Sequence, residues 1–251
     1  MSEKILESQL FDIIKDEEMA ENIKLAKIDM LIRLGVDVNA MYGAKSALKL
    51  ANEVNNQKVI EFLENNGAKD IFDEEIAQKL GWDLIEVCEN GEKKDVEELI
   101  DKGADVNQKD EDGNTALMRA SYWGYKEVVE LLIQNGADVH SKSNNGNTAL
   151  MRASYWGYKE VVELLIRNGA DVNQKDEDGN TALMRASCGG RKEVVELLIQ
   201  KGADVNAKSV TGDTALIIAK DEKIKKAIID AVKKRNEKTE ENVIIQGVER
   251  E

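Results

Sequence analysis

The chain has 251 residues, of which 33% are charged, and its formal net charge is −14 at pH 7. That charge disfavours nucleic-acid backbones and anionic membranes as partners, because they carry charge of the same sign. No apolar run approaches the length of a membrane span, and the acidic N-terminal residues do not form a secretion signal. We therefore expect a cytoplasmic protein, built as one elongated array or as two ordinary domains.

Residues 1–67 contain two predicted helix pairs. Apolar residues recur at helical spacing in two segments of residues 1–34, which predicts the first pair. The sequence GVDVN at residues 35–39 resembles the ends of the repeats described below, so this pair is read as a degenerate first repeat. A second degenerate pair follows and is closed by Gly67.

Residues 68–81 form an irregular junction. Gly67 and Gly103 are 36 residues apart, whereas the later glycines of the same series are 33 apart. We expect a short extra helix near Glu74–Leu80 and one continuous stack, because a break would expose two apolar faces. Two arrays joined head to tail are the alternative.

Residues 82–232 form the main array. The sequence GNTALMRASYWGYKEVVELLI at Gly113–Ile133 returns unchanged at Gly146–Ile166. A third copy at Gly179–Ile199 keeps GNTALMRAS and KEVVELLI, and a fourth begins at Gly212 with GDTALIIA. Self-similarity at a fixed period of 33 residues indicates a stacked array, in which each unit buries its apolar face against its neighbours.

Each unit reads as a helix pair followed by a loop. Thr115 is placed to cap a first helix that Gly124 ends. The second helix has an apolar face over Val128–Ile133, and Gly136 supplies the left-handed residue that ends it. The sequence ADVNQKDEDGN has turn chemistry and predicts a projecting, hairpin-like finger. The last unit has a lysine-rich second helix, as a terminal cap requires for solubility.

The pattern G-x-T-A-L-x-x-A, then G, V-V-E-L-L and G-A-D-V-N, resembles the ankyrin repeat over four consecutive units. The resemblance implies an all-α solenoid of stacked helix-turn-helix units with projecting β-turn fingers, which binds proteins. The family's T-P-L-H reads T-A-L-M at Thr115–Met118. The missing histidine is the side chain that in the family ties the finger to the helices. ENNGAKD at Glu64–Asp70 resembles the end of such an array and WDLIEVCENG at Trp82–Gly91 the start of one.

Aromatic residues are concentrated in two adjacent units. Six of the eight tryptophans and tyrosines lie there. The resemblance places four of them on the concave face, where such rings are frequent at binding hot spots: Tyr122, Trp123, Tyr155 and Trp156. In the next unit the same registers hold Cys188 and Gly189. The alternative is that the rings pack between repeats as core.

The fingers vary in sequence between copies whose helices are identical, which suits a scaffold that presents changeable contacts, although recent duplication explains the identity equally well. The resemblance places these partner-binding residues beside the aromatic rings: Lys109, Glu111, Asp112, Asn114, Lys142, Asn144, Asn145, Asn147, Lys175, Glu177, Asp178 and Asn180. Three arginines recur at the same period and either flank the groove or only solvate it: Arg119, Arg152 and Arg185.

The sequence offers no candidate for catalysis, for a metal site or for a cofactor. The finger around Asp110–Gly113 fails the calcium-loop pattern, and His140 is the only histidine. Cys88 reads as a buried reduced thiol and Cys188 as a surface residue. No phosphate-binding loop or nucleophile motif is present.

We therefore predict a monomeric, non-enzymatic module that binds a protein partner through its concave face and fingers. A self-assembling structural stack is the rival prediction. A laboratory consensus design is a third, although the degenerate first 103 residues and the tail argue against it. The polar tail at residues 233–251 is expected to be disordered.

Overall fold

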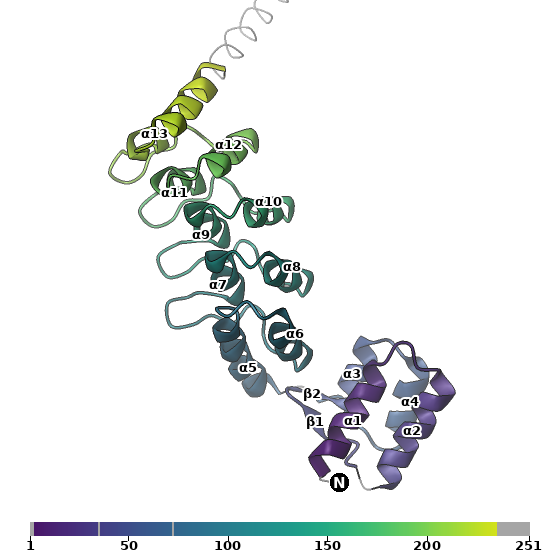
Figure 1. Ribbon diagram of the computed structural model, residues 1–251. Helices are drawn as coiled ribbons and strands as arrows, with labels where there is room; N and C mark the ends of the chain where they lie inside the picture. Colours follow the sequence, from purple (N-terminus) through teal and green to yellow (C-terminus); the bar gives the residue numbers. More distant parts are fainter. Residues whose placement is uncertain (1–2, 35, 72, 235–251) are drawn as a thin grey trace, which may run out of the picture. The chain divides into compact units, whose positions relative to one another are not determined.

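The computed structural model describes residues 3–34, 36–71 and 73–234 (Figure 1). Most of the tail whose disorder the sequence predicts, residues 235–251, lies outside the described residues. The chain divides into two compact units, which are described one at a time. The first consists of Met1–Leu84 with Glu97–Asp105, and the second of Ile85–Val96 with Val106–Glu251.

The first unit is built from two helix pairs and a short hairpin. Its helices are α1 (Glu3–Lys15), α2 (Glu21–Arg33), α3 (Ala47–Glu53) and α4 (Gln57–Asn65). Strands β1 (Met41–Tyr42) and β2 (Lys45–Ser46) pair antiparallel around Gly43, whose φ of +63° permits the tight turn. The helices share one apolar core, whose largest fully buried side chains are Leu10, Phe11, Ile14, Ile28, Leu31 and Leu63.

The helix predicted at the junction is longer than the sequence indicated. A single helix, α5 (Glu74–Val87), covers the expected segment Glu74–Leu80 and the start of the next repeat. Gly81 lies inside it and is buried. Helix α6 (Lys93–Asp101) follows, and both helices contribute residues to the two units.

The second unit repeats one helix pair. The first helices of successive pairs are α7 (Ala116–Trp123), α9 (Ala149–Trp156), α11 (Ala182–Cys188) and α13 (Ala215–Ile218). The second helices are α8 (Lys126–Gln134), α10 (Lys159–Arg167) and α12 (Lys192–Gln200), and residues 222–234 form a last helix. Figure 1 shows the first helices in one row, the second helices in a parallel row, and the finger loops on one side. This arrangement confirms the all-α solenoid that the sequence predicts.

Local chemistry explains why each pair forms where it does. Oγ1 of Thr115 accepts a hydrogen bond from the backbone N–H of Met118, and Thr148 and Thr181 cap α9 and α11 in the same way. Gly124 ends α7 with a left-handed φ of +79°. The second helices bury their valines and leucines against neighbouring pairs, as Val128, Val129, Leu131 and Leu132 do in α8.

Helices α7, α9 and α11 lie side by side because they carry the same small and apolar residues at the same positions. None of the helices within the described ranges is both long enough and apolar enough to cross a membrane.

Candidate functional site

Four aromatic rings gather on the row of first helices, and we call them the aromatic cluster: Tyr122, Trp123, Tyr155 and Trp156. Trp123, Tyr155 and Trp156 have 45%, 38% and 37% of their surface exposed, and Tyr122 is half-buried. Tyr122 on α7 meets Trp156 on α9 edge to face, with ring centroids 5.3 Å apart and planes at 79°. Tyr122–Trp123 and Tyr155–Trp156 pack in the same manner at 5.2 and 5.3 Å. Edge-to-face packing holds the rings in fixed positions while their outer faces stay open to solvent.

The other two tyrosines of these units have a structural role. Tyr125 packs on Gly91 and Tyr158 packs on Gly124, each time the glycine between the two helices of the preceding pair. Arg191 takes the equivalent place over Gly157. These side chains therefore fix the spacing of consecutive pairs and are not available to a partner in the way the cluster is.

The aromatic cluster ends at the third pair. Cys188 stands at the register of Tyr155 and is exposed, as the sequence indicates. Gly189 stands at the register of Trp156, where a Cβ would lie 2.2 Å from the carbonyl oxygen of Tyr155. A tryptophan in that place would need the backbone to move, so the third pair leaves one end of the cluster open.

The finger lysines connect one finger to the next. Nζ of Lys109 donates to the carbonyl of Lys142 at 2.8 Å, and Nζ of Lys142 donates to the carbonyl of Lys175 at 3.4 Å. Lys175 donates in turn to the carbonyl of Lys208 at 2.9 Å. Three residues expected to contact a partner thus also hold the fingers at their spacing.

The remaining predicted finger residues fall into two groups. Six are exposed and available to a partner: Glu111, Asp112, Asn144, Asn145, Glu177 and Asp178. Asn114 is buried at 4% exposure, and Asn147 and Asn180 are half-buried. The last three accordingly belong to the packing at the base of the fingers, close to the arginines.

Salt bridges tie the fingers to the helices in two of the units. Nη2 of Arg119 donates to Oδ2 of Asp110 at 2.8 Å, and its Nη1 forms a salt bridge with Oε1 of Glu89 at 3.0 Å. Nη2 of Arg185 donates to Oδ2 of Asp176, whose side chain is 1% exposed, at 2.5 Å. The pairing links each finger to the first helix that follows it. Sequence reasoning missed it, although aspartate precedes arginine by nine residues in both copies.

The middle unit breaks this pattern. Ser143 stands at the register of Asp110 and Asp176, so Arg152 meets no carboxylate within salt-bridge distance among the described residues. Its Nη2 donates instead to the neutral Oδ1 of Asn114. We call Arg119, Arg152 and Arg185 the arginine row. Among the described residues, Arg152 is the member of this row that makes no salt bridge.

Both arrangements lower a pKa, but the lower pKa favours the charged form of Asp110 and disfavours the charged form of Arg152. Burial alone would raise the pKa of Asp110, but hydrogen bonds from Arg119 and Asn114 outweigh it and hold that pKa below its ordinary value. Burial lowers the pKa of Arg152, and the positive charge of Arg119 adds to the effect, which the negative charge of Asp110 offsets only in part. Arg152 still carries its charge, since a guanidinium stays protonated in proteins.

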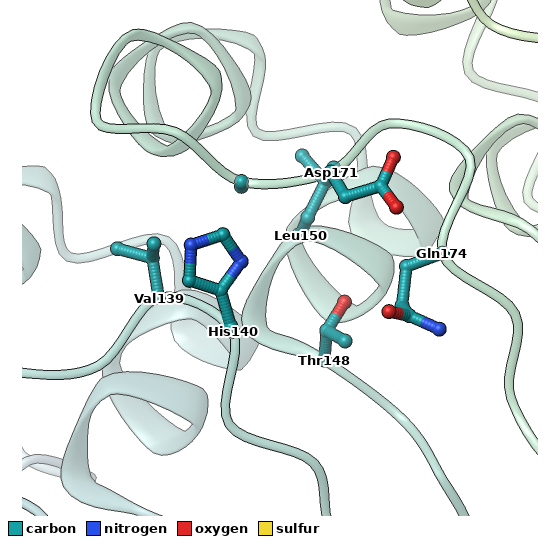
Figure 2. A pocket seen from close by; sticks show the side chains of 7 residues that line it. Val139, His140, Thr148, Leu150, Asp171 and Gln174 are labelled. Atoms are coloured by element: carbon teal, nitrogen blue, oxygen red, sulfur yellow. The ribbon is translucent and has the colours of Figure 1, made fainter.

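A small hollow at the base of the fingers marks another departure from the repeat. Figure 2 shows His140 and Thr148 on one side of it and Asp171 and Gln174 of the next unit on the other. In the neighbouring units an asparagine spans this place, as Asn107 does by binding the carbonyl of Gly136 at 3.0 Å and the N–H of Asp138 at 2.8 Å.

Asn173 makes the same two bonds, to Gly202 and Asp204. His140 occupies the equivalent position, and within the described ranges its imidazole makes neither bond, which leaves the hollow.

The described residues contain no group of three or more histidine, cysteine or acidic side chains arranged to hold a metal ion. Cys88 is fully buried at the register of Ser121, and burial raises the pKa of its thiol to about 12. A buried thiol with so high a pKa is a poor nucleophile and a poor metal ligand.

Comparison with known proteins gives the same architecture. A family model described as ankyrin repeats, in three copies, matches residues 84–176 and 162–238, which together make up more than half of the chain. A search of curated proteins finds no match. The capped helix pairs, the 33-residue period and this match agree, and the chain belongs to the ankyrin-repeat family.

Proposed function

We propose that this protein is a non-enzymatic module that binds a protein partner through the aromatic cluster and the neighbouring fingers. Ankyrin repeats are in general protein–protein interaction modules. The observation that carries the proposal is the exposure of Trp123, Tyr155 and Trp156, each more than a third open to solvent in two adjacent units. Exposed tryptophans and tyrosines at fixed positions are the side chains most often found at interface hot spots.

Rigidity supports the proposal. The rings are braced edge to face, so a partner that covers them does not have to order them first, and less conformational entropy is lost on binding. The six exposed finger residues differ in charge between units, with acidic pairs in two fingers and the amides Asn144 and Asn145 between them. Polar residues of this kind suit the rim of an interface whose centre is apolar.

The proposed module acts as a monomer in the cytoplasm, without a cofactor.

A double substitution tests the proposal. Peptides that bind the full-length protein are selected from a random library displayed on phage, and their affinities are then measured by calorimetry as synthetic peptides. Trp123→Ala combined with Trp156→Ala is expected to weaken binding at least 100-fold, as the loss of two hot-spot rings predicts. The helical far-UV circular dichroism should not change, because both rings are exposed.

Trp82 provides the matched control. It is 56% exposed but belongs to the first unit, so Trp82→Ala should leave peptide affinity unchanged. Unchanged affinity in the double variant would contradict the proposal, and loss of the helical signal would place the two rings in the core instead.

Self-association is the second candidate function. On α2 and at its C-cap the apolar side chains Ile23, Met30 and Leu34 are 49%, 55% and 59% exposed. An apolar surface of this kind also suits contact with another copy of the chain. Light scattering across a range of concentrations separates the two functions, because a self-assembling stack gains mass on concentration and a monomeric receptor does not.

A further inference from the structure

One member of the arginine row, Arg152, makes no salt bridge among the described residues, and it lies beside the aromatic cluster. Arg119 is bound by two carboxylates and Arg185 by one, whereas Arg152 between them has only the amide oxygen of Asn114. The helix that carries Arg152 does not cause this difference, since α7 and α9 have identical sequences. Compared with Arg185, the difference comes from a single finger position, where Ser143 stands at the register of Asp176. Compared with Arg119, Tyr122 also stands at the register of Glu89.

A charge in this setting favours an external counter-ion. Arg152 is half-buried, and burial already disfavours its charged form. A buried or partly buried ion is stabilised when it is paired and hydrogen-bonded, and a guanidinium offers two parallel donors that match a carboxylate. The ordinary source of that carboxylate, the finger of the same unit, is missing here.

The place of Arg152 links it to the aromatic cluster. It precedes Trp156 by four residues on α9, so both side chains lie on the same face of that helix. Tyr122 lies near Arg152, and the ring of Tyr122 packs on Trp156. A ligand that reaches Arg152 therefore also covers aromatic surface.

The geometry points to Arg152 as the residue that selects the partner, by binding the side-chain carboxylate of a glutamate or aspartate that lies next to an apolar residue in the partner's chain. This inference rests on the proposed function, because it names the partner chemistry of the same surface.

The surroundings favour a carboxylate over a phosphate. Negative side chains lie on both sides of Arg152, since Asp110 and Glu89 pair with Arg119 and Asp176 pairs with Arg185. The chain as a whole carries a net charge of −14. A doubly charged phosphate would be repelled more strongly than a singly charged carboxylate. The same repulsion weighs against any partner with a long run of acidic residues, so one or two acidic side chains in an otherwise apolar or basic segment fit best.

The chain itself supplies the variant that tests this inference. Ser143→Asp places in the middle finger the aspartate that the neighbouring fingers already carry. Oγ of Ser143 accepts a hydrogen bond from the N–H of Asn147, as Asp110 does from Asn114 and Asp176 from Asn180. The new carboxylate should pair with Arg152 internally and compete with the partner. Ser143→Asn is the matched control, because it has nearly the same shape and no charge.

The experiment uses the full chain and peptides selected from the phage library, in which no free peptide C-terminus is presented. The peptides are then synthesised with amidated C-termini and measured by calorimetry. We expect the selected sequences to share an aspartate or glutamate next to an apolar residue. Exchange of that residue for its amide should weaken binding about 10- to 100-fold, which is the usual strength of a charge-assisted bond.

Ser143→Asp should weaken binding of the acidic peptide by a similar factor, and Ser143→Asn should not. In the Ser143→Asp protein the acidic peptide and its amide form should bind almost equally, because the two changes remove the same interaction. Thermal unfolding of the three proteins should show no loss of stability in Ser143→Asp.

The outcomes separate this inference from the proposed function. If the amide peptides bind the wild type as well as the acidic ones do, yet still need Trp123 and Trp156, the role of Arg152 is overturned and the binding face stands. If the selected peptides bind without those tryptophans, or if no peptide is selected, the proposed function and the role of Arg152 are both overturned. The exchange in the peptide needs no protein variant, so it tests the role of Arg152 even if Ser143→Asp does not fold.

Discussion

Tyr158 lies against Gly124 so closely that a Cβ on residue 124 would be 2.5 Å from Cδ1 of the tyrosine ring. Gly124 also has a φ of +79°, a conformation that side chains with a Cβ rarely adopt. The turn between the helices of one pair is thereby packed against the same turn of the next pair, and glycine satisfies both conditions.

Gly124→Ala is expected to lower the free energy of unfolding by about 2–4 kcal/mol, from backbone strain together with overpacking against the ring. Gly136→Ala is the control, because Gly136 has a similar φ of +85° but no atom within 4 Å of the added Cβ. It should cost only about 1 kcal/mol of strain. Urea unfolding of the two variants measures the difference, and equal costs would show that the tyrosine moves aside freely.

His140→Asn should stabilise the protein. The new asparagine can bind the carbonyl of Gly169 and the N–H of Asp171, as Asn173 binds Gly202 and Asp204 in the next unit. Two such bonds are worth about 1–2 kcal/mol together. The reverse exchange, Asn173→His, should cost a similar amount. Chemical denaturation checks both, and a neutral His140→Asn would mean that the hollow in Figure 2 already satisfies these groups.

The two thiols should differ in reactivity. Cys188 is exposed, whereas Cys88 is buried and its pKa is raised to about 12. At pH 8 a thiol reagent should label one cysteine in the native protein and both in denaturant, and Cys188→Ser should remove the native reaction. The pKa of the Cys88 thiol in the folded protein lies above its unfolded value of about 8.5, so this thiol stabilises the fold at low pH. The free energy of unfolding should therefore fall as pH rises above about 8.5. Rapid native labelling of the Cys188→Ser protein would contradict this assignment.

Acid should weaken the link between Asp110 and Arg119. The pKa of Asp110 is held below its ordinary value in the folded protein, so the contribution of this carboxylate is present above the unfolded pKa of about 3.9 and disappears as pH falls below it. Asp110→Ser copies the serine of the middle unit. The free energy of unfolding of this variant should therefore fall less between pH 5 and pH 3 than that of the wild type. The midpoint of thermal unfolding at each pH measures this, and parallel curves for both proteins would exclude the linkage.

Local signals made the helix pairs predictable from the sequence. Thr115 and Gly124 define the ends of α7 through contacts within a few residues, and the structure places them as expected. The helix predicted near Glu74–Leu80 is too short: glycine costs only about 1 kcal/mol inside a helix, and α5 continues through Gly81 to Val87.

The exposure of the aromatic cluster was within reach of sequence reasoning, because Trp123 and Trp156 occupy one helical register. The lysine contacts between fingers and the salt bridges of Arg119 and Arg185 were not. They depend on side chains that meet only after neighbouring units have stacked. Periodicity shows which residues are equivalent, but it does not show that Arg152 lacks a salt bridge because Ser143 stands at the register of Asp110 and Asp176.

The identity of α7 and α9 has a consequence for the length of the array. The joint between α9 and α11 is made by nearly the same side chains as the joint between α7 and α9. Loss or gain of one 33-residue segment would therefore connect surfaces that already fit. The length of the array and the extent of its surface can thus change by one whole repeat at a time, while the stability of each joint stays nearly constant.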